Sequence, residues 1–170
     1  MKIRSALIAA AAISAIAGTA SAQALDSAEG TADVKVKFLT PITITATSAT
    51  ALDFGTLVRS GTGAGSIVVT RAGARGTVTD LTAVTASTVS AASFTVNGTP
   101  SETISVSAAV TGMPSGVTVT PNFGDASQTL GSDGSLTLPV GGTLAVASGT
   151  ANSAIAGSHT GTMTVTVAYP

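Results

Sequence analysis

From residue 162 to the end of the chain, apolar and polar side chains alternate without interruption. Met163, Val165, Val167 and Tyr169 fall on one side, and three threonines and an alanine fall on the other. A period of two with threonine on the wet face is typical of a half-buried β-strand. Burying four such side chains contributes about 6–12 kcal/mol, comparable with the roughly 5–15 kcal/mol of net stability of a domain. We therefore predict a terminal strand that the fold requires.

Shorter alternating stretches recur along the rest of the chain. Residues 34–38 and 42–45 are the first two, and Pro41 between them indicates a sheet edge or a crossing between sheets. A third stretch, 52–57, carries Gly55, which predicts a bulge. The other predicted strands are 67–70, 76–79, 93–96, 103–110, 116–120, 136–138 and 143–146.

Turn residues separate these stretches at nearly regular spacing. Residues 71–75 would close a hairpin, and Asn97-Gly98 ends a strand. Residues 84–92 are ambiguous, because their alanines allow a short helix while their context disfavours one. We expect a loop over 122–135 after a strand that stops at Pro121. Nine or ten short strands without a repeat predict an all-β sandwich.

The first residues have the order of an export signal. Two basic residues precede an apolar run at 6–17, and Ala-Ser-Ala at 20–22 offers a cleavage site. We predict a signal peptide over 1–22, cleaved before Gln23, with cleavage after Ala24 as the alternative. No later run is apolar enough for a membrane helix, so we expect an exported, soluble protein without membrane insertion.

Composition limits what the exported part can be. Of the 170 residues, 44% are hydrophobic, which argues against disorder. The remainder after the signal is long enough for a flexible N-terminal arm over 23–33 and one β-sandwich domain over 34–170. The chain has 7 basic and 8 acidic residues, and two of the basic ones lie in the predicted signal. The exported part therefore lacks the excess of positive charge that is typical of nucleic-acid-binding proteins. Only 9% of residues are charged, which leaves strand edges poorly protected against pairing.

The chain offers little that indicates catalysis. It has no cysteine, which excludes disulfides and thiolate metal sites. His159 is the only histidine, so an imidazole metal site or a serine–histidine–aspartate relay would have to use it; we interpret it as a surface-loop residue. The glycine-rich 61–65 segment lacks the lysine and the helix of a phosphate-binding loop, so a hairpin loop is favoured.

The remaining polar candidates also favour a structural reading. Asn122, Asp125 and Asp133 do not have the spacing of a calcium loop, and we interpret them as solvated. Asp53 and Glu102 are separated carboxylates without a partner signal. The glycosylation sequon at 97–99 is better explained as a turn. We therefore predict no enzyme activity, no metal and no cofactor.

Motifs at both ends of the domain resemble an uncharacterised family of small exported bacterial β-domains. These are Thr-Pro-Ile-Thr-Ile at 40–44 and Leu-Asp-Phe-Gly at 52–55, with Val-Gly-Gly-Thr-Leu at 140–144 and the closing stretch 160–169. Each motif is short, but their order and separation are fairly specific and cover most of the exported chain.

The last strand also resembles that of chaperone–usher pilus subunits, with Tyr169 next to last and Gly157 fourteenth from the end. The resemblance implies an immunoglobulin-like sandwich that lacks one strand. It also implies a periplasmic chaperone and an outer-membrane usher as partners, with copies of the chain donating strands to each other. The residues that the resemblance assigns to the chaperone and subunit interface are Gly157, Met163, Val165, Val167 and Tyr169.

The strand that would be donated has one candidate. Residues 23–33 lack alternating bulky side chains, whereas Val34, Val36 and Phe38 form an apolar face with two lysines opposite. We therefore expect a structural subunit of a bacterial surface fibre or pilus, secreted through the periplasm to the cell surface. The alternative is a complete monomeric exported sandwich that binds a surface glycan or an envelope protein.

Overall fold

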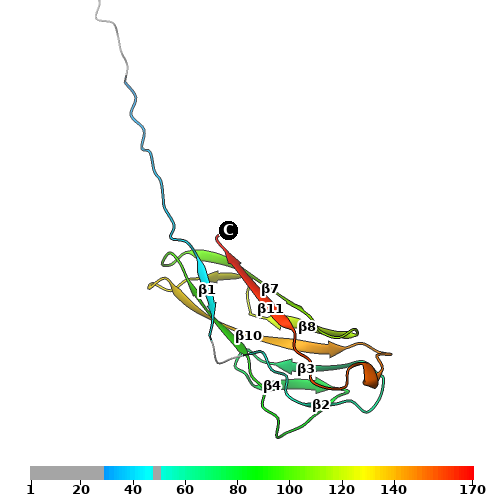
Figure 1. Cartoon of the computed structure of the whole chain (residues 1–170). Helices are drawn as coiled ribbons and strands as arrows, with labels where there is room; N and C mark the ends of the chain where they lie inside the picture. The colour runs from blue at the N-terminus through cyan, green and yellow to red at the C-terminus, as the bar shows by residue number, and fades with distance from the viewer. Residues whose placement is uncertain (1–28, 48–50) are drawn as a thin grey trace, which may run out of the picture. The chain divides into compact units, whose positions relative to one another are not determined.

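The computed structural model describes residues 29–47 and 51–170 (Figure 1). Residues 1–28 and 48–50 lie outside the described part, and so do the predicted signal peptide and most of the predicted arm. Lys37–Pro170 form one compact unit. Among the described residues, no helix has the length and apolar character needed to cross a membrane.

The described part is all-β, as the alternation predicts. All its strand pairs are antiparallel. Its only helical element is a single 3₁₀ turn at Asn152–Ala154, so the short helix allowed over 84–92 does not form. That segment instead contains a turn and the residue Ser90, which forms an isolated bridge with Asp53.

The largest sheet is built around one long strand, β10, which lies between the other strands of this sheet (Figure 1). The strand order is β1-β6-β10-β3-β4, and β8 also pairs with β10. The bounds are β1 (Thr43–Ala46), β3 (Gly65–Val69), β4 (Arg75–Thr79), β6 (Ala92–Asn97), β8 (Val117–Asn122) and β10 (Ser135–Val146).

A second sheet has three strands in the order β11-β7-β9, with bounds Thr162–Ala168, Thr103–Thr111 and Ser127–Thr129. β2 (Leu57–Val58) and β5 (Thr82–Ala83) form a further short pair. Buried side chains from both larger sheets form one cluster, with Val96 and Leu138 contributed by β6 and β10 and Ile104 and Val106 by β7. The two larger sheets therefore share this apolar cluster, whose buried members are all aliphatic.

β10 shows why a proline and two glycines misled the sequence reading. Two separate strands were predicted at 136–138 and 143–146, but β10 is continuous and changes neighbour from β6 to β3 in its middle. Pro139 lies opposite Ser93 of β6. The Ser93 carbonyl faces the other neighbour of β6, because it accepts a hydrogen bond at 2.9 Å from the amide of Thr47, the residue after β1. In an antiparallel ladder, residues opposite each other alternate between hydrogen-bonded and non-hydrogen-bonded pairs. Pro139 and Ser93 form a non-hydrogen-bonded pair, so the ladder does not need the amide N–H that proline lacks.

Two other strand predictions near the N-terminus are wrong. Residues 34–38 form no strand and are all exposed. The stretch 52–57 is not one strand either: only the bridge at Asp53 and the short β2 remain of it. Between them the backbone bends at Gly55, whose φ is +73° and whose amide donates to the Asp53 carboxylate at 2.7 Å. A left-handed residue at this point suits glycine and interrupts the ladder.

Two predictions in the second half also need correction. β8 does not stop at Pro121 but continues to Asn122, which is possible because β8 pairs only with β10 and has an open edge for the proline. The loop predicted over 122–135 contains β9, whose three residues pair with the start of β7. The hairpin predicted around 71–75 is confirmed by the pairing of β3 with β4.

Candidate functional site

The terminal strand β11 has one free edge. Within residues 29–47 and 51–170 it pairs with β7 alone, from Thr162 opposite Thr111 to Ala168 opposite Ser105. Its seven residues include no proline and no charged side chain, and its register with β7 is unbroken. Natural sheet edges are usually protected by prolines, charged side chains or bulges, and β11 has none of these. Its backbone is therefore open to pairing with another strand.

The two faces of β11 differ as the sequence predicts. Met163, Val165 and Val167 are half-buried against the core cluster, while the residues between them are exposed. None of the three is fully buried, in contrast to Ile104 and Val106 on the neighbouring β7, which are at most 4% exposed. The apolar face of this sheet is therefore less well covered at its open edge than one strand further in.

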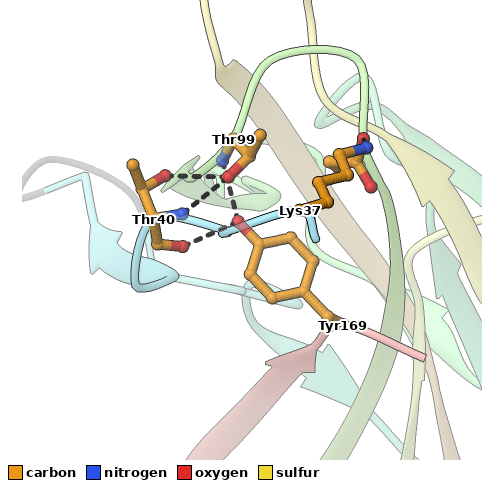
Figure 2. A network of polar contacts seen from close by, with 5 residues as sticks. Lys37, Thr40, Thr99 and Tyr169 are labelled. Atoms are coloured by element: carbon orange, nitrogen blue, oxygen red, sulfur yellow. Dashed lines mark hydrogen bonds and ion pairs between the residues drawn. The ribbon is translucent and has the colours of Figure 1, made fainter. Parts of the chain in front are cut away.

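Tyr169 follows β11 and joins three segments that are distant in the sequence (Figure 2). Its hydroxyl donates a hydrogen bond to the carbonyl of Thr40 at 3.0 Å and accepts one from the amide of Thr99 at 2.7 Å. The amide of Thr40 in turn donates to the Thr99 hydroxyl at 2.7 Å. The end of the terminal strand is thus tied to the segment before β1 and to the loop before β7.

An ion pair extends this network. Lys37 forms an ion pair with Glu102, the residue directly before β7. The side chain of Glu102 is 25% exposed. Gly98 makes the approach of the tyrosine possible, because a Cβ there would meet the Tyr169 hydroxyl at 2.5 Å and the buried Leu130 at 2.9 Å. We call Lys37, Thr40, Thr99, Glu102 and Tyr169 together the Tyr169 clasp.

The network acts on the ionisation of the phenol. Hydrogen bonds from Thr99, first from its side chain and then from its amide, lower the pKa of Tyr169 below its ordinary value of about 10. A donor to the phenolic oxygen stabilises the phenolate more than the neutral phenol, and this effect exceeds the opposing influence of partial burial.

The candidate donor residues lie outside all strands. Val34 is 95% exposed, Val36 73% and Phe38 85%. Val36 and the residues before it are outside the compact unit, whereas Phe38 belongs to it, between the two clasp residues Lys37 and Thr40. All three side chains are therefore exposed, and none belongs to the core cluster.

Gly157, the remaining predicted assembly residue, lies in the loop before β11. Its φ is +103°, a conformation that favours glycine, and a Cβ at this position would meet no atom within 4 Å. The chain bends at this residue, and the space beside it is open.

The other polar candidates form local structure. Asn122 accepts a hydrogen bond from the amide of Gly124, and Asp133 accepts one from the amide of Ser135. His159 is exposed, with its Nε2 3.1 Å from the Ile155 carbonyl. No cluster of three histidine, aspartate or glutamate side chains suited to a metal occurs among the residues that the structure describes.

Two surface hollows of the described part bear on the polar candidates. One, of about 350 Å³, is lined by Arg71, Val89, Ala92 and Pro139 among others. The second, of about 320 Å³, lies beside the glycine-rich loop predicted at 61–65. Arg59 lines this second hollow and holds the loop, because its guanidinium donates to the carbonyls of Gly63, Ala147 and Thr150.

Sequence reasoning identified the strand and its tyrosine but missed the clasp. Thr40 and Thr99 belong to short motifs that were read as a family signature and a turn, and Glu102 was read as an unpaired carboxylate. The partners of these residues are 59 to 129 positions away. No local pattern reports contacts at such a separation.

A family model described as a domain of unknown function, DUF4402, matches residues 42–169. This range covers most of the chain, so the chain belongs to the DUF4402 family. It includes the terminal strand and Tyr169, and it begins after the candidate donor residues. No curated protein and no solved structure matches the chain.

Proposed function

For this member of the DUF4402 family, we propose a non-enzymatic structural role, as a subunit of a bacterial surface fibre or pilus that assembles by β-strand donation. The proposal assigns the domain an immunoglobulin-like sandwich that lacks one strand. A signal peptide over 1–22 would direct the chain through the periplasm to the cell surface.

The observation that supports this role most is the unpaired edge of β11 together with its half-buried apolar face. A strand added at this edge would pair with the free backbone groups and cover Met163, Val165 and Val167. Strand addition of this kind derives affinity from main-chain hydrogen bonds and specificity from alternate side chains.

The arm of a second copy has the matching pattern. Val34, Val36 and Phe38 are exposed at every second position, and the lysines between them would stay in water. Burying three such side chains contributes about 5–9 kcal/mol before the cost of association. The unpaired edge of β11 is also the reason that we propose a periplasmic chaperone and an outer-membrane usher as partners, because the edge would need cover until a neighbouring subunit arrives.

The oligomeric state of the exported, processed chain tests the role. We expect size-exclusion chromatography at increasing concentration to show multimers, and the double variant Val34→Asp/Val36→Asp to remain monomeric, because the two carboxylates would be buried unpaired in the neighbour. The matched control is Lys35→Thr, which changes the opposite face of the same segment and should still assemble. A concentration-independent monomer of the unchanged chain would contradict the proposal.

The second candidate is a monomeric module that binds a surface glycan or an envelope protein. The hollow beside Arg71 favours it, because this exposed guanidinium makes no ion pair among the described residues and lies next to an apolar wall. A monomer whose Arg71→Ala variant loses binding to bacterial surface polysaccharide would support this module in place of the fibre.

A further inference from the structure

We propose that the Tyr169 clasp keeps the arm away from the chain's own β11 edge, so that this edge is left for a second copy. The inference rests on the proposed function, and it concerns which arm can reach which edge. An exposed donor segment and an open acceptor edge in the same chain could otherwise close on each other, and a chain closed in this way could not assemble.

The clasp fixes the place where the arm leaves the domain. Thr40 is bonded to Tyr169, the residue that follows β11, so the root of the arm lies at the C-terminal end of that strand. From there the chain leads to Lys37, which is paired with Glu102, directly before β7 (Figure 2). β7 lies on the paired side of β11, whereas the free edge lies on the opposite side. Residues 37–40 thus lead away from the edge that the arm would have to reach.

Closure onto the chain's own edge would require the clasp to open. For the segment before Lys37 to pair with this edge, the Lys37–Glu102 ion pair and the hydrogen bond between Thr40 and Tyr169 would have to break. If only the ion pair opened and Thr40 stayed bonded to Tyr169, the returning segment would run parallel to β11, because its root would remain at the strand's C-terminal end. An arm from a second copy has no such constraint and can add antiparallel, the arrangement that is slightly more stable per residue.

Engineered cysteines can report which edge receives the arm, because the chain has none of its own. Lys35→Cys and Thr166→Cys place thiols on the wet faces of the donor and acceptor strands, where neighbouring residues across a strand pair are close enough for a disulfide. The full processed chain is oxidised and resolved on a denaturing gel without reductant. Intact mass after thiol alkylation separates internally linked monomers from free ones.

With the clasp intact, we expect linked multimers and little internally linked monomer. Opening the clasp by Tyr169→Phe with Glu102→Gln should raise the internally linked monomer several-fold and reduce the multimers correspondingly. Glu102→Gln alone should change both in the same direction, and it covers the case in which the double variant fails to fold. Asp125→Asn is the matched control, because it removes an exposed carboxylate that forms no ion pair within residues 29–47 and 51–170.

The outcomes separate the two proposals. Multimers with the same small fraction of internally linked monomer in the intact and opened forms would overturn the role of the clasp and leave strand donation standing. A large internally linked fraction with the clasp intact would overturn it as well. An absence of cross-links in both forms would contradict strand donation itself, and the clasp would then be only a tie within the domain.

Discussion

Residues 34–38 and the terminal strand 162–168 carry the same alternating pattern and have different structures. Both place valines at every second position with polar residues between them. In β11 the alternate side chains are half-buried and the backbone is paired with β7, whereas Val34 and Val36 are exposed and unpaired in the described chain. The comparison shows that period two defines which side chains share a face, while a strand forms only where a neighbour supplies hydrogen bonds and cover.

The largest effect expected from this comparison is on the apolar face of β11. We predict that Val165→Asp lowers the free energy of unfolding by about 3 kcal/mol or more, because it places a carboxylate against the core. Met163→Asp and Val167→Asp should act in the same way. Thr164→Asp and Thr166→Asp, on the exposed face of the same strand, should change it by less than about 1 kcal/mol. Denaturant unfolding of the five variants measures this, and equal losses on both faces would mean that β11 is covered on both sides.

The contrast also marks how far local sequence reasoning extends. It predicted the all-β class and the two faces of β11, since these depend on alternation and composition. It placed a break within β10 because proline interrupts most strands. Pro139 is tolerated because the carbonyl of the opposite residue, Ser93, bonds to Thr47 and not to β10, and this contact is not visible in the sequence. The clasp depends on contacts between residues such as Thr40 and Tyr169, which topology alone brings together.

A smaller effect concerns the end of β11. Tyr169 is the only tyrosine and the chain has no tryptophan, so the phenolate absorbance at alkaline pH reports on this residue alone. Because hydrogen bonds from Thr99 lower the pKa of Tyr169, we expect its titration midpoint in the folded protein to lie below that in denaturant. Thr99→Val should move the midpoint upward, and Thr103→Val, an exposed threonine of β7, should not.

The sign of the accompanying stability change follows from the same shift. Between the folded and the unfolded pKa of Tyr169, the unfolded chain holds the proton that the folded chain has released. Stability from this group therefore rises as pH increases through that window, and it is lost as pH falls through the folded pKa. Melting temperatures measured across the window should show this rise in the unchanged chain and a weaker rise in Thr99→Val. A fall in that window would mean that another group dominates the alkaline response.

The smallest effect is expected in the region that lacks a neighbour. Val36→Asp should change the unfolding free energy of the dilute monomer by less than about 0.5 kcal/mol, because the side chain is 73% exposed and lies outside the compact unit. The same substitution at Val165 is the matched comparison, since residue type and alternating context are alike and only the burial differs. Denaturant unfolding at a concentration below assembly measures both. A loss at Val36 approaching that at Val165 would show that the arm packs against its own domain in solution, and the difference between the two alternating stretches would then disappear.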